Sequence, residues 1–312
     1  MKYSLLGNTG INVSALCFGS LTMGPLQNGL PPEEGGSLLL EAFEAGVNFV
    51  DTAQLYQTYP HIRWALKRFG GEVAVATKTY AYTLEAASQA LEEARSGLGR
   101  DVIDIMLLHE QESGHTLRGH AEALDFLLSE KAKGRIRAVG LSTHAVAGVD
   151  AAVSAGLDVV HPLLNLSGLG ILDGSREDME AAVLRAREAG LGIYTMKALG
   201  GGHLFARAAE ALVYAMRWGH SLAVGMKSRL ELASNLYFWE HGHFQPDNEE
   251  ILLRQSRQIF IEDHCDMCRR CILACKAKAL VPQGFRVSWN KSSCVFCGYC
   301  AAHCQEFCIK MI

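Results

Sequence analysis

The chain has 312 residues, of which 49% are hydrophobic, and this length is enough for one large α/β domain and a small second one. Its net charge of -4, with no block of like charges, excludes the broad basic surface that nucleic acid requires. The first 20 residues lack a charged start followed by an apolar stretch, and no run of about 18 apolar residues follows. We therefore expect a cytoplasmic protein that binds neither nucleic acid nor a membrane.

The first 224 residues are predicted to form a hairpin followed by eight repeated units. Gly7 to Gly10 lie between two short apolar runs and predict a β-turn, in a hairpin placed to close the floor of a barrel. Short apolar runs then alternate with longer amphipathic stretches, which is typical of parallel strands joined by helices. Strands are predicted at residues 16–18, 49–51, 73–78, 103–109, 138–142, 159–164, 193–196 and 222–224. Helices are predicted at residues 37–45, 84–98, 117–133, 176–188 and 207–218.

Eight such units in about 210 residues favour a (β/α)8 TIM barrel. A doubly wound open sheet is the alternative, and it would carry a G-x-G-x-x-G motif after its first strand. Gly19-Ser20-Leu21 follows the first predicted strand and does not continue that motif. The sequence therefore predicts the α/β class, with a TIM barrel and a small C-terminal α+β domain.

Three polar residues, Asp51, Lys78 and His109, each end a predicted strand. The C-terminal ends of barrel strands open onto one face, so these side chains are expected to meet there. Tyr56 lies five residues past Asp51, in the following loop. An ammonium favours a nearby phenolate, so we expect Lys78 to lower the pKa of Tyr56 and Asp51 to orient Lys78. Tyr56 would exchange a proton with a carbonyl or alcohol oxygen that His109 orients.

The same region resembles the aldo-keto reductases. Residues 51–56 are similar to their D-T-A-x-x-Y segment, and the resemblance covers residues 1–236. It implies a catalytic tetrad of Asp51, Tyr56, Lys78 and His109, with NADP(H) as the hydride source. It places the NADP(H) contacts at Gly19, Ser20, Ser142, Asn165, Gly225, Lys227, Ser228 and Asn235. Four residues differ from those usual in the family: Thr143, His161, Met196 and Glu231.

The β-α pattern ends after Asn235, and Pro246 with the acidic residues behind it predicts a new helix start. We therefore expect the barrel at residues 1–244, a connecting helix at 245–260 and a cysteine-rich domain at 261–312.

Ten cysteines are unevenly placed: Cys17 stands alone and is expected in the core, and the others lie between Cys265 and Cys308. Two runs share the spacing C-x2-C-x2-C-x3-C and begin 29 residues apart. Three thiolates within seven residues wrap one cubane, and the fourth reaches the other cluster. The spacing predicts one [4Fe-4S] cluster on Cys265, Cys268, Cys271 and Cys304 and a second on Cys294, Cys297, Cys300 and Cys275.

Residues 261–312 resemble the bacterial-type ferredoxins, although Lys276 and Gln305 stand where that family usually has proline. Two structural zinc sites are the alternative, but a zinc site takes two C-x2-C pairs and leaves the third cysteine of each run unexplained. Cys308 corresponds to Ala279 of the first run and is expected to be a small residue packed near a cluster.

Hydride transfer from nicotinamide needs no cluster, so ordinary aldo-keto chemistry does not explain the cysteine-rich domain. We expect an iron-sulfur oxidoreductase that interconverts a carbonyl and an alcohol with NADP(H), with the clusters as an electron relay or a regulatory clamp. The alternative is a ferredoxin-linked electron-transfer protein whose barrel does not use nicotinamide. The expected partners are a small carbonyl or alcohol substrate and a redox protein such as a ferredoxin or flavodoxin, because basic residues outnumber acids after residue 255.

Overall fold

A computed structural model describes residues 1–247, 258–263, 265–304 and 308–311. Eight parallel strands close into a barrel in the order β10-β3-β4-β5-β6-β7-β8-β9. The barrel strands are β3 (Leu16–Gly19), β4 (Phe49–Asp51), β5 (Ala74–Thr79), β6 (Ile103–Leu108), β7 (Ile136–Thr143), β8 (Val159–Pro162), β9 (Gly192–Thr195) and β10 (Ser221–Gly225). The predicted TIM barrel is confirmed, and the doubly wound alternative is wrong because β10 pairs with β3 and closes the sheet.

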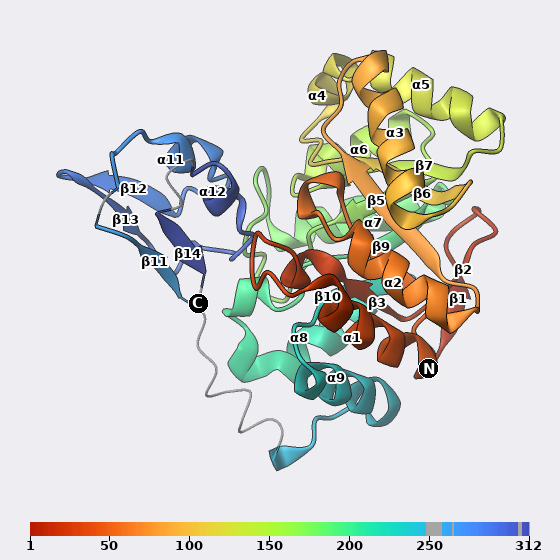
Figure 1. Ribbon diagram of the computed structural model, residues 1–312. Helices are drawn as coiled ribbons and strands as arrows, with labels where there is room; N and C mark the ends of the chain where they lie inside the picture. Colours follow the sequence, from red (N-terminus) through yellow and green to blue (C-terminus); the bar gives the residue numbers. More distant parts are fainter. Residues whose placement is uncertain (248–257, 264, 305–307, 312) are drawn as a thin grey trace.

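Helices surround the barrel (Figure 1). They are α1 (Pro32–Glu44), α2 (Tyr59–Phe69), α3 (Leu84–Leu98), α4 (Gly114–Gly119), α5 (Ala121–Ala132), α6 (Val146–Ser154), α7 (Arg176–Glu188), α8 (Ala208–Met216) and α9 (Arg229–His241). The prediction omitted α2, α6 and α9. It also joined α4 and α5, which are separated at His120, next to the poor helix former Gly119.

The barrel strands alternate between two hydrophobic clusters, as the two-residue period of a strand requires. Phe18 and Val50 pack in the large cluster shared with the helices, while Cys17 and Phe49 pack in the barrel interior. Cys17 is thus a core residue, as predicted.

The predicted hairpin is also confirmed, because β1 (Tyr3–Leu5) pairs antiparallel with β2 (Asn12–Ser14). Leu6 between them joins the interior cluster, so the hairpin covers one end of the barrel. Gly7 has a φ of 53°, and a Cβ there would lie 2.4 Å from the Gly192 nitrogen. This close approach requires glycine.

The C-terminal segment, residues 258–311, lies beside the barrel and is blue in Figure 1. Two antiparallel pairs form its sheets, and two short helices accompany them. The pairs are β11 (Ile259–Ile261) with β14 (Ile309–Met311) and β12 (Leu280–Gln283) with β13 (Arg286–Trp289), and the helices are α11 (Arg270–Ala274) and α12 (Tyr299–Ala302). In the described residues no helix combines the length and the apolar character that crossing a membrane would take.

The connecting helix predicted at 245–260 falls mainly on residues 248–257, which lie outside the described residues. Residues 259 and 260 belong to β11 instead, because their backbone pairs with β14.

The backbone of the C-terminal segment follows the 29-residue repeat. Met267 and Phe296 both have a positive φ, of 58° and 47°, and Arg269 and Gly298 do so at 62° and 82°. Each of these two pairs is 29 residues apart. Non-glycine residues adopt a positive φ rarely, so its recurrence at matched positions indicates two copies of one loop conformation.

Candidate functional site

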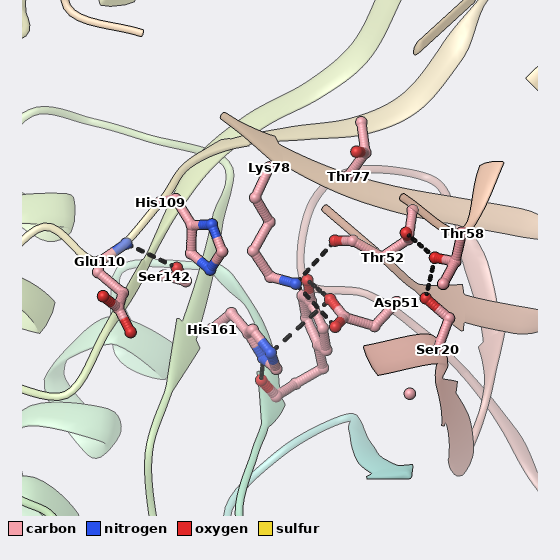
Figure 2. A network of polar contacts seen from close by, with 12 residues as sticks. Ser20, Asp51, Thr52, Thr58, Thr77, Lys78, His109, Glu110, Ser142 and His161 are labelled. Carbon is pink, nitrogen blue, oxygen red and sulfur yellow. Dashed lines mark hydrogen bonds and ion pairs between the residues drawn. The ribbon is translucent and has the colours of Figure 1, made fainter. Parts of the chain in front are cut away.

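A buried ion pair occupies the C-terminal end of the barrel. Lys78 on β5 donates from Nζ to Asp51 Oδ2 at 2.7 Å and to the Thr52 carbonyl at 2.8 Å (Figure 2). The Tyr194 hydroxyl donates to the other oxygen, Asp51 Oδ1, at 2.9 Å. Burial lowers the pKa of Lys78, and Asp51 opposes that effect. Removing either partner would leave a buried charge unpaired, so the two side chains fix each other.

Tyr56 lies directly above this pair, in the 3-10 turn η2 (Gln54–Tyr56) that follows β4. The Lys78 Nζ is 4.9 Å from the centroid of its ring. Burial raises the pKa of Tyr56 well above its usual range, and the carboxylates of Asp51 and Glu110 raise it further. The expected lowering of the Tyr56 pKa is therefore wrong, because burial and the nearby carboxylates raise it.

His109 follows β6 and completes the group, with its ring centroid 5.7 Å from that of Tyr56. Its ring stacks on Tyr80 at 4.4 Å, and its Nε2 lies 3.1 Å from the hydroxyl of Tyr299. Burial, aided by the charge of Lys78, lowers the pKa of His109 well below its usual range. The imidazole is therefore neutral at pH 7 and can orient an oxygen without carrying a charge.

His161 on β8 lies next to Asp51, with its Nε2 3.7 Å from Asp51 Oδ1. Its ring stacks on Tyr194 at 3.8 Å, and its Nδ1 lies 2.6 Å from the Tyr194 carbonyl oxygen. Burial lowers the pKa of His161 to about 4, although Asp51 acts in the opposite direction.

This buried imidazole predicts a loss of stability in acid. An unfolded histidine has a pKa of about 6.5. Below that pH the imidazole is protonated in the unfolded chain but stays neutral in the folded protein. The free energy of unfolding then falls as the pH falls, by about 2 kcal/mol between pH 7.5 and 5 from this residue, with no effect above pH 7. His161→Gln should remove that part of the pH dependence in urea unfolding curves. The exposed His243→Gln is the control, and parallel curves for wild type and H161Q would contradict the prediction.

A cavity of about 540 Å³ opens beside the tetrad and reaches Asp51 and Tyr56. Four of the predicted cofactor residues line it, namely Gly19, Gly225, Lys227 and Asn235. A volume in this range suits a small-molecule or cofactor site.

The other four predicted cofactor residues, Ser20, Ser142, Asn165 and Ser228, are not part of the cavity lining. Their side chains bond to the protein. Ser20 Oγ is 2.7 Å from Thr58 Oγ1, and Ser142 Oγ accepts from the Glu110 nitrogen at 2.9 Å (Figure 2).

Asn165 organises the loop after β8, where its Oδ1 accepts from the Leu169 nitrogen at 3.0 Å and its Nδ2 donates to the Leu169 carbonyl at 2.8 Å. Ser228 caps α9 by accepting from the Glu231 nitrogen at 3.2 Å. Both residues therefore shape the walls around the cavity.

The cavity wall suits an anionic ligand. Lys197, Lys227 and Lys291 line it, against two carboxylate residues, Asp51 and Glu231. Gly201 and Gly202, both with positive φ, add backbone in a loop after β9. Successive amides in such turns form concavities that bind phosphate, so these residues fit a phosphorylated dinucleotide.

The C-terminal segment forms part of the same wall through Val295, Phe296 and Cys297. Gln27 donates to the Phe296 carbonyl at 3.0 Å, and Lys276 forms an ion pair with Glu112. These contacts seat the segment on the barrel mouth.

The contact between the two halves is tight. A Cβ on Gly201 would lie 2.4 Å from the Val295 backbone, and one on Gly298 would lie 2.7 Å from the Leu26 carbonyl oxygen. The His203 ring bonds to the Cys294 carbonyl. Backbone of the C-terminal segment therefore packs directly on backbone of the barrel.

The cysteines of the C-terminal segment affect one another's pKa in two sets. Burial raises the pKa of the Cys271 thiol, and Cys265, Cys304 and Cys268 raise it further. Burial likewise raises the pKa of the Cys300 thiol, with added effects from Cys297, Cys294 and Cys275. Each group thus combines three cysteines of one run with the fourth of the other.

Two backbone amides point at cysteine sulfurs in matching positions. Ala279 donates to Cys275 Sγ at 3.2 Å, and Cys308 donates to Cys304 Sγ at 3.2 Å, 29 residues later. Hydrogen bonds to ligand sulfurs are one means by which proteins tune iron-sulfur clusters. Cys308 is buried, as is Ala279 at the equivalent position of the first run, which fits a small packed residue.

No three His, Cys, Asp or Glu side chains in the described part of the chain are arranged to hold a single metal ion. A cubane has a different requirement, because each thiolate binds its own iron and the four sulfurs stand further apart than around one ion. The paired groups and the N–H···S bonds therefore suit two cubane clusters.

Sequence reasoning missed three residues of this site, namely Tyr194, Lys197 and Tyr299. Lys197 directly follows the strand predicted at 193–196, so the strand-end signal that found Lys78 applied to it too. Its φ of 59° is a rare conformation of the kind that concentrates at functional sites. No sequence signal placed Tyr299 next to His109, because that contact depends on how the two halves pack.

Comparisons with known proteins agree with the barrel. Residues 15–250 match the aldo/keto reductase family. L-galactose dehydrogenase from Arabidopsis thaliana is 28% identical over 149 residues, which are 44% of this chain and 47% of that protein. An aldo-keto reductase from Mycolicibacterium paratuberculosis is 30% identical over 118 residues, which are 36% and 41% of the two chains. The chain thus spans about half the length of the curated relatives it matches.

Solved structures show the same fold. An aldo-keto reductase from Pseudomonas aeruginosa gives a TM-score of 0.65 at 23% identity and covers 77% of this chain and 94% of its own. The holo form of an aldo-keto reductase from Bacillus halodurans gives 0.64 at 18%, with coverage of 81% and 96%. The match over residues 15–250 shows that the chain belongs to the aldo/keto reductase family.

Proposed function

We propose that this chain interconverts a carbonyl and an alcohol with NADP(H), and that its C-terminal segment holds two [4Fe-4S] clusters. The observation that carries the first part is the buried Lys78–Asp51 pair at 2.7 Å beneath Tyr56, with His109 alongside. A phenol above a buried ammonium and beside a neutral imidazole is suited to proton exchange with a substrate oxygen.

Each side chain of the tetrad would have its own role in the reaction. Tyr56 would give its hydroxyl proton to the carbonyl oxygen as that oxygen gains charge, and Lys78 would stabilise the phenolate that remains. Asp51 and Thr52 hold the ammonium in place. His109 would orient the same oxygen from its Nε2. Bound nicotinamide would supply the hydride to the carbonyl carbon.

The cavity supports nicotinamide as the hydride source. Gly19, Gly225, Lys227 and Asn235 line it, and it reaches Tyr56. Lys227 and the glycines after β9 would bind phosphate groups.

We also propose one cluster on Cys265, Cys268, Cys271 and Cys304, and another on Cys294, Cys297, Cys300 and Cys275. The paired groups of cysteines, the repeated positive φ values and the matched N–H···S bonds support both sites. Lys197 also opposes the effect of burial on the pKa of the Cys297 thiol, so its ammonium would balance part of the charge of a cluster.

The position of Cys297 favours a role of the clusters as an electron relay over a purely regulatory role. This residue borders both the second cysteine group and the cavity. An external redox protein such as a ferredoxin or flavodoxin would be the other end of that relay.

The test is anaerobic purification, iron and sulfide analysis, and a titration with NADPH. We expect nicotinamide fluorescence to report binding and a small aldehyde to be reduced. Bleaching of the cluster absorbance by NADPH would support the relay, while binding without bleaching would favour the clamp. Intact clusters without NADPH binding would contradict the nicotinamide proposal and favour a partner protein as the electron source.

Glu231 predicts how the cavity distinguishes dinucleotides. Its carboxylate lines the cavity beside Lys227 and Asn235 and accepts from the Lys227 nitrogen at 2.8 Å. A carboxylate repels the adenosine 2'-phosphate of NADPH, whereas an arginine binds it. Glu231→Arg should lower the Kd of NADPH by about tenfold and leave that of NADH nearly unchanged.

Glu240→Arg is the matched control, because Glu240 lies on the same helix α9 and its side chain is 75% exposed. Binding is measured by nicotinamide fluorescence. An equal gain for both dinucleotides, or an equal gain in E240R, would mean that general surface charge is responsible and not the 2'-phosphate.

A further inference from the structure

Tyr299 brings a phenol from the C-terminal segment into the barrel mouth. It is the first residue of α12, and it packs with Leu26, Ala53 and Tyr56 in one hydrophobic cluster. Only 7% of its surface is exposed. Its hydroxyl lies 3.1 Å from His109 Nε2, so the side chain spans from the C-terminal segment to the tetrad.

The ring of Tyr299 also packs with Tyr56 in that cluster and stands edge-on to the His109 ring, with the two centroids 6.2 Å apart. Tyr56 and His109 are the two groups that the proposed reaction assigns to the substrate oxygen. Both already contact one side chain of the protein itself, His109 through its hydrogen bond and Tyr56 through packing.

The shape of the open space agrees with this arrangement. Asp51 and Tyr56 line the cavity, but His109 is 2% exposed and is not among the lining residues. The side of the tetrad on which a carbonyl oxygen must sit is therefore filled by Tyr299.

The 294–300 loop is fixed by its own contacts. Gln27 and His203 bond to its carbonyls, and Gly298 packs against Leu26. The phenol can therefore be displaced, or lose its hydroxyl, without loss of the contacts that seat the loop.

We propose that the Tyr299 hydroxyl occupies the substrate-oxygen site between Tyr56 and His109, which makes Tyr299 a specificity-determining residue of the carbonyl site. This inference rests on the proposed carbonyl chemistry of the tetrad. A substrate must place its oxygen where the phenol oxygen lies, so entry requires the loss of the Tyr299–His109 hydrogen bond. Carbonyls that bond strongly to Tyr56 and His109 are admitted, and weak acceptors are excluded.

Tyr299→Phe tests this proposal in the full-length, cluster-loaded protein. It removes the oxygen and keeps the ring, so the two groups are released for substrate. The KM for butanal should fall by about tenfold, as expected for the loss of one competing hydrogen bond, with kcat changed less than twofold. Phe285→Ala is the control, because Phe285 is an aromatic residue of the same segment and is 96% exposed.

Butyrate provides a second readout that needs no turnover. Its carboxylate accepts from Tyr56 and His109 and cannot be reduced by hydride under these conditions, so calorimetry should show about tenfold tighter binding to Y299F than to wild type. An unchanged KM with unchanged butyrate affinity would overturn the proposal, as would a loss of kcat at constant KM, which would place Tyr299 in the proton path.

The kinetic and the binding measurements together distinguish a failure of this inference from a failure of the proposed function. If neither wild type nor Y299F reduces butanal but Y299F alone gains butyrate affinity, the carbonyl chemistry fails while the oxygen site holds. If butyrate binds to neither protein, the oxygen site itself is refuted.

Discussion

Replacing Tyr56 with phenylalanine is expected to lower kcat for aldehyde reduction by about 10²- to 10⁴-fold, the usual contribution of a positioned general acid. The phenol is the proton donor that the buried Lys78–Asp51 pair supports, and Lys78 Nζ lies 4.9 Å from its ring centroid. Phenylalanine keeps the ring and its packing but carries no proton to donate. Steady-state kinetics with butanal, together with NADPH binding by fluorescence, measures the effect.

NADPH binding should be almost unchanged in Y56F, because the cavity wall is built mainly by other residues. Tyr237→Phe is the matched control, since Tyr237 lies on α9 and its ring contacts His241. A Y56F enzyme with wild-type kcat would refute the tetrad mechanism. Equal loss in Y237F would instead indicate a general effect on folding.

The strand-end residues of the tetrad were predictable because a parallel barrel opens the C-terminal ends of all its strands onto one face. Lys78 and Asp51 satisfy that rule, and their 2.7 Å contact follows from adjacent strands β4 and β5. The net shift of the Tyr56 pKa was not predictable. It depends on how completely the ring is buried and on the carboxylates of Asp51 and Glu110, which raise the pKa further.

The cofactor wall was predicted in part for a similar reason. Lys227 and Gly225 lie at or just after the end of a strand and line the cavity. Ser20 instead bonds to Thr58, which is far away in the sequence, and Asn165 bonds within its own loop to Leu169. The contribution of the C-terminal segment was not predicted at all. Cysteine spacing specifies ligands within that segment, but it contains no information about which barrel surface the segment packs against.

Replacing Cys300 with alanine should lower the iron content from about eight atoms per chain to about four, because it removes one ligand of the second cluster and none of the first. The expected group is supported by the mutual effects of Cys300, Cys297, Cys294 and Cys275 on the thiol pKa. Iron and sulfide analysis of anaerobically purified protein, with electron paramagnetic resonance after reduction, measures the loss.

Cys308→Ala is the matched control, because alanine stands at the equivalent position 279 of the first run. It should keep both clusters, since the variant retains the Cys308 backbone nitrogen that donates to Cys304 Sγ. Full iron in C300A, or equal loss in both variants, would refute the ligand assignment. Because Tyr299 precedes Cys300, loss of the second cluster should also disturb the Tyr299–His109 contact and change the KM for butanal in C300A. An unchanged KM together with the loss of four iron atoms would show that the barrel contacts alone position Tyr299.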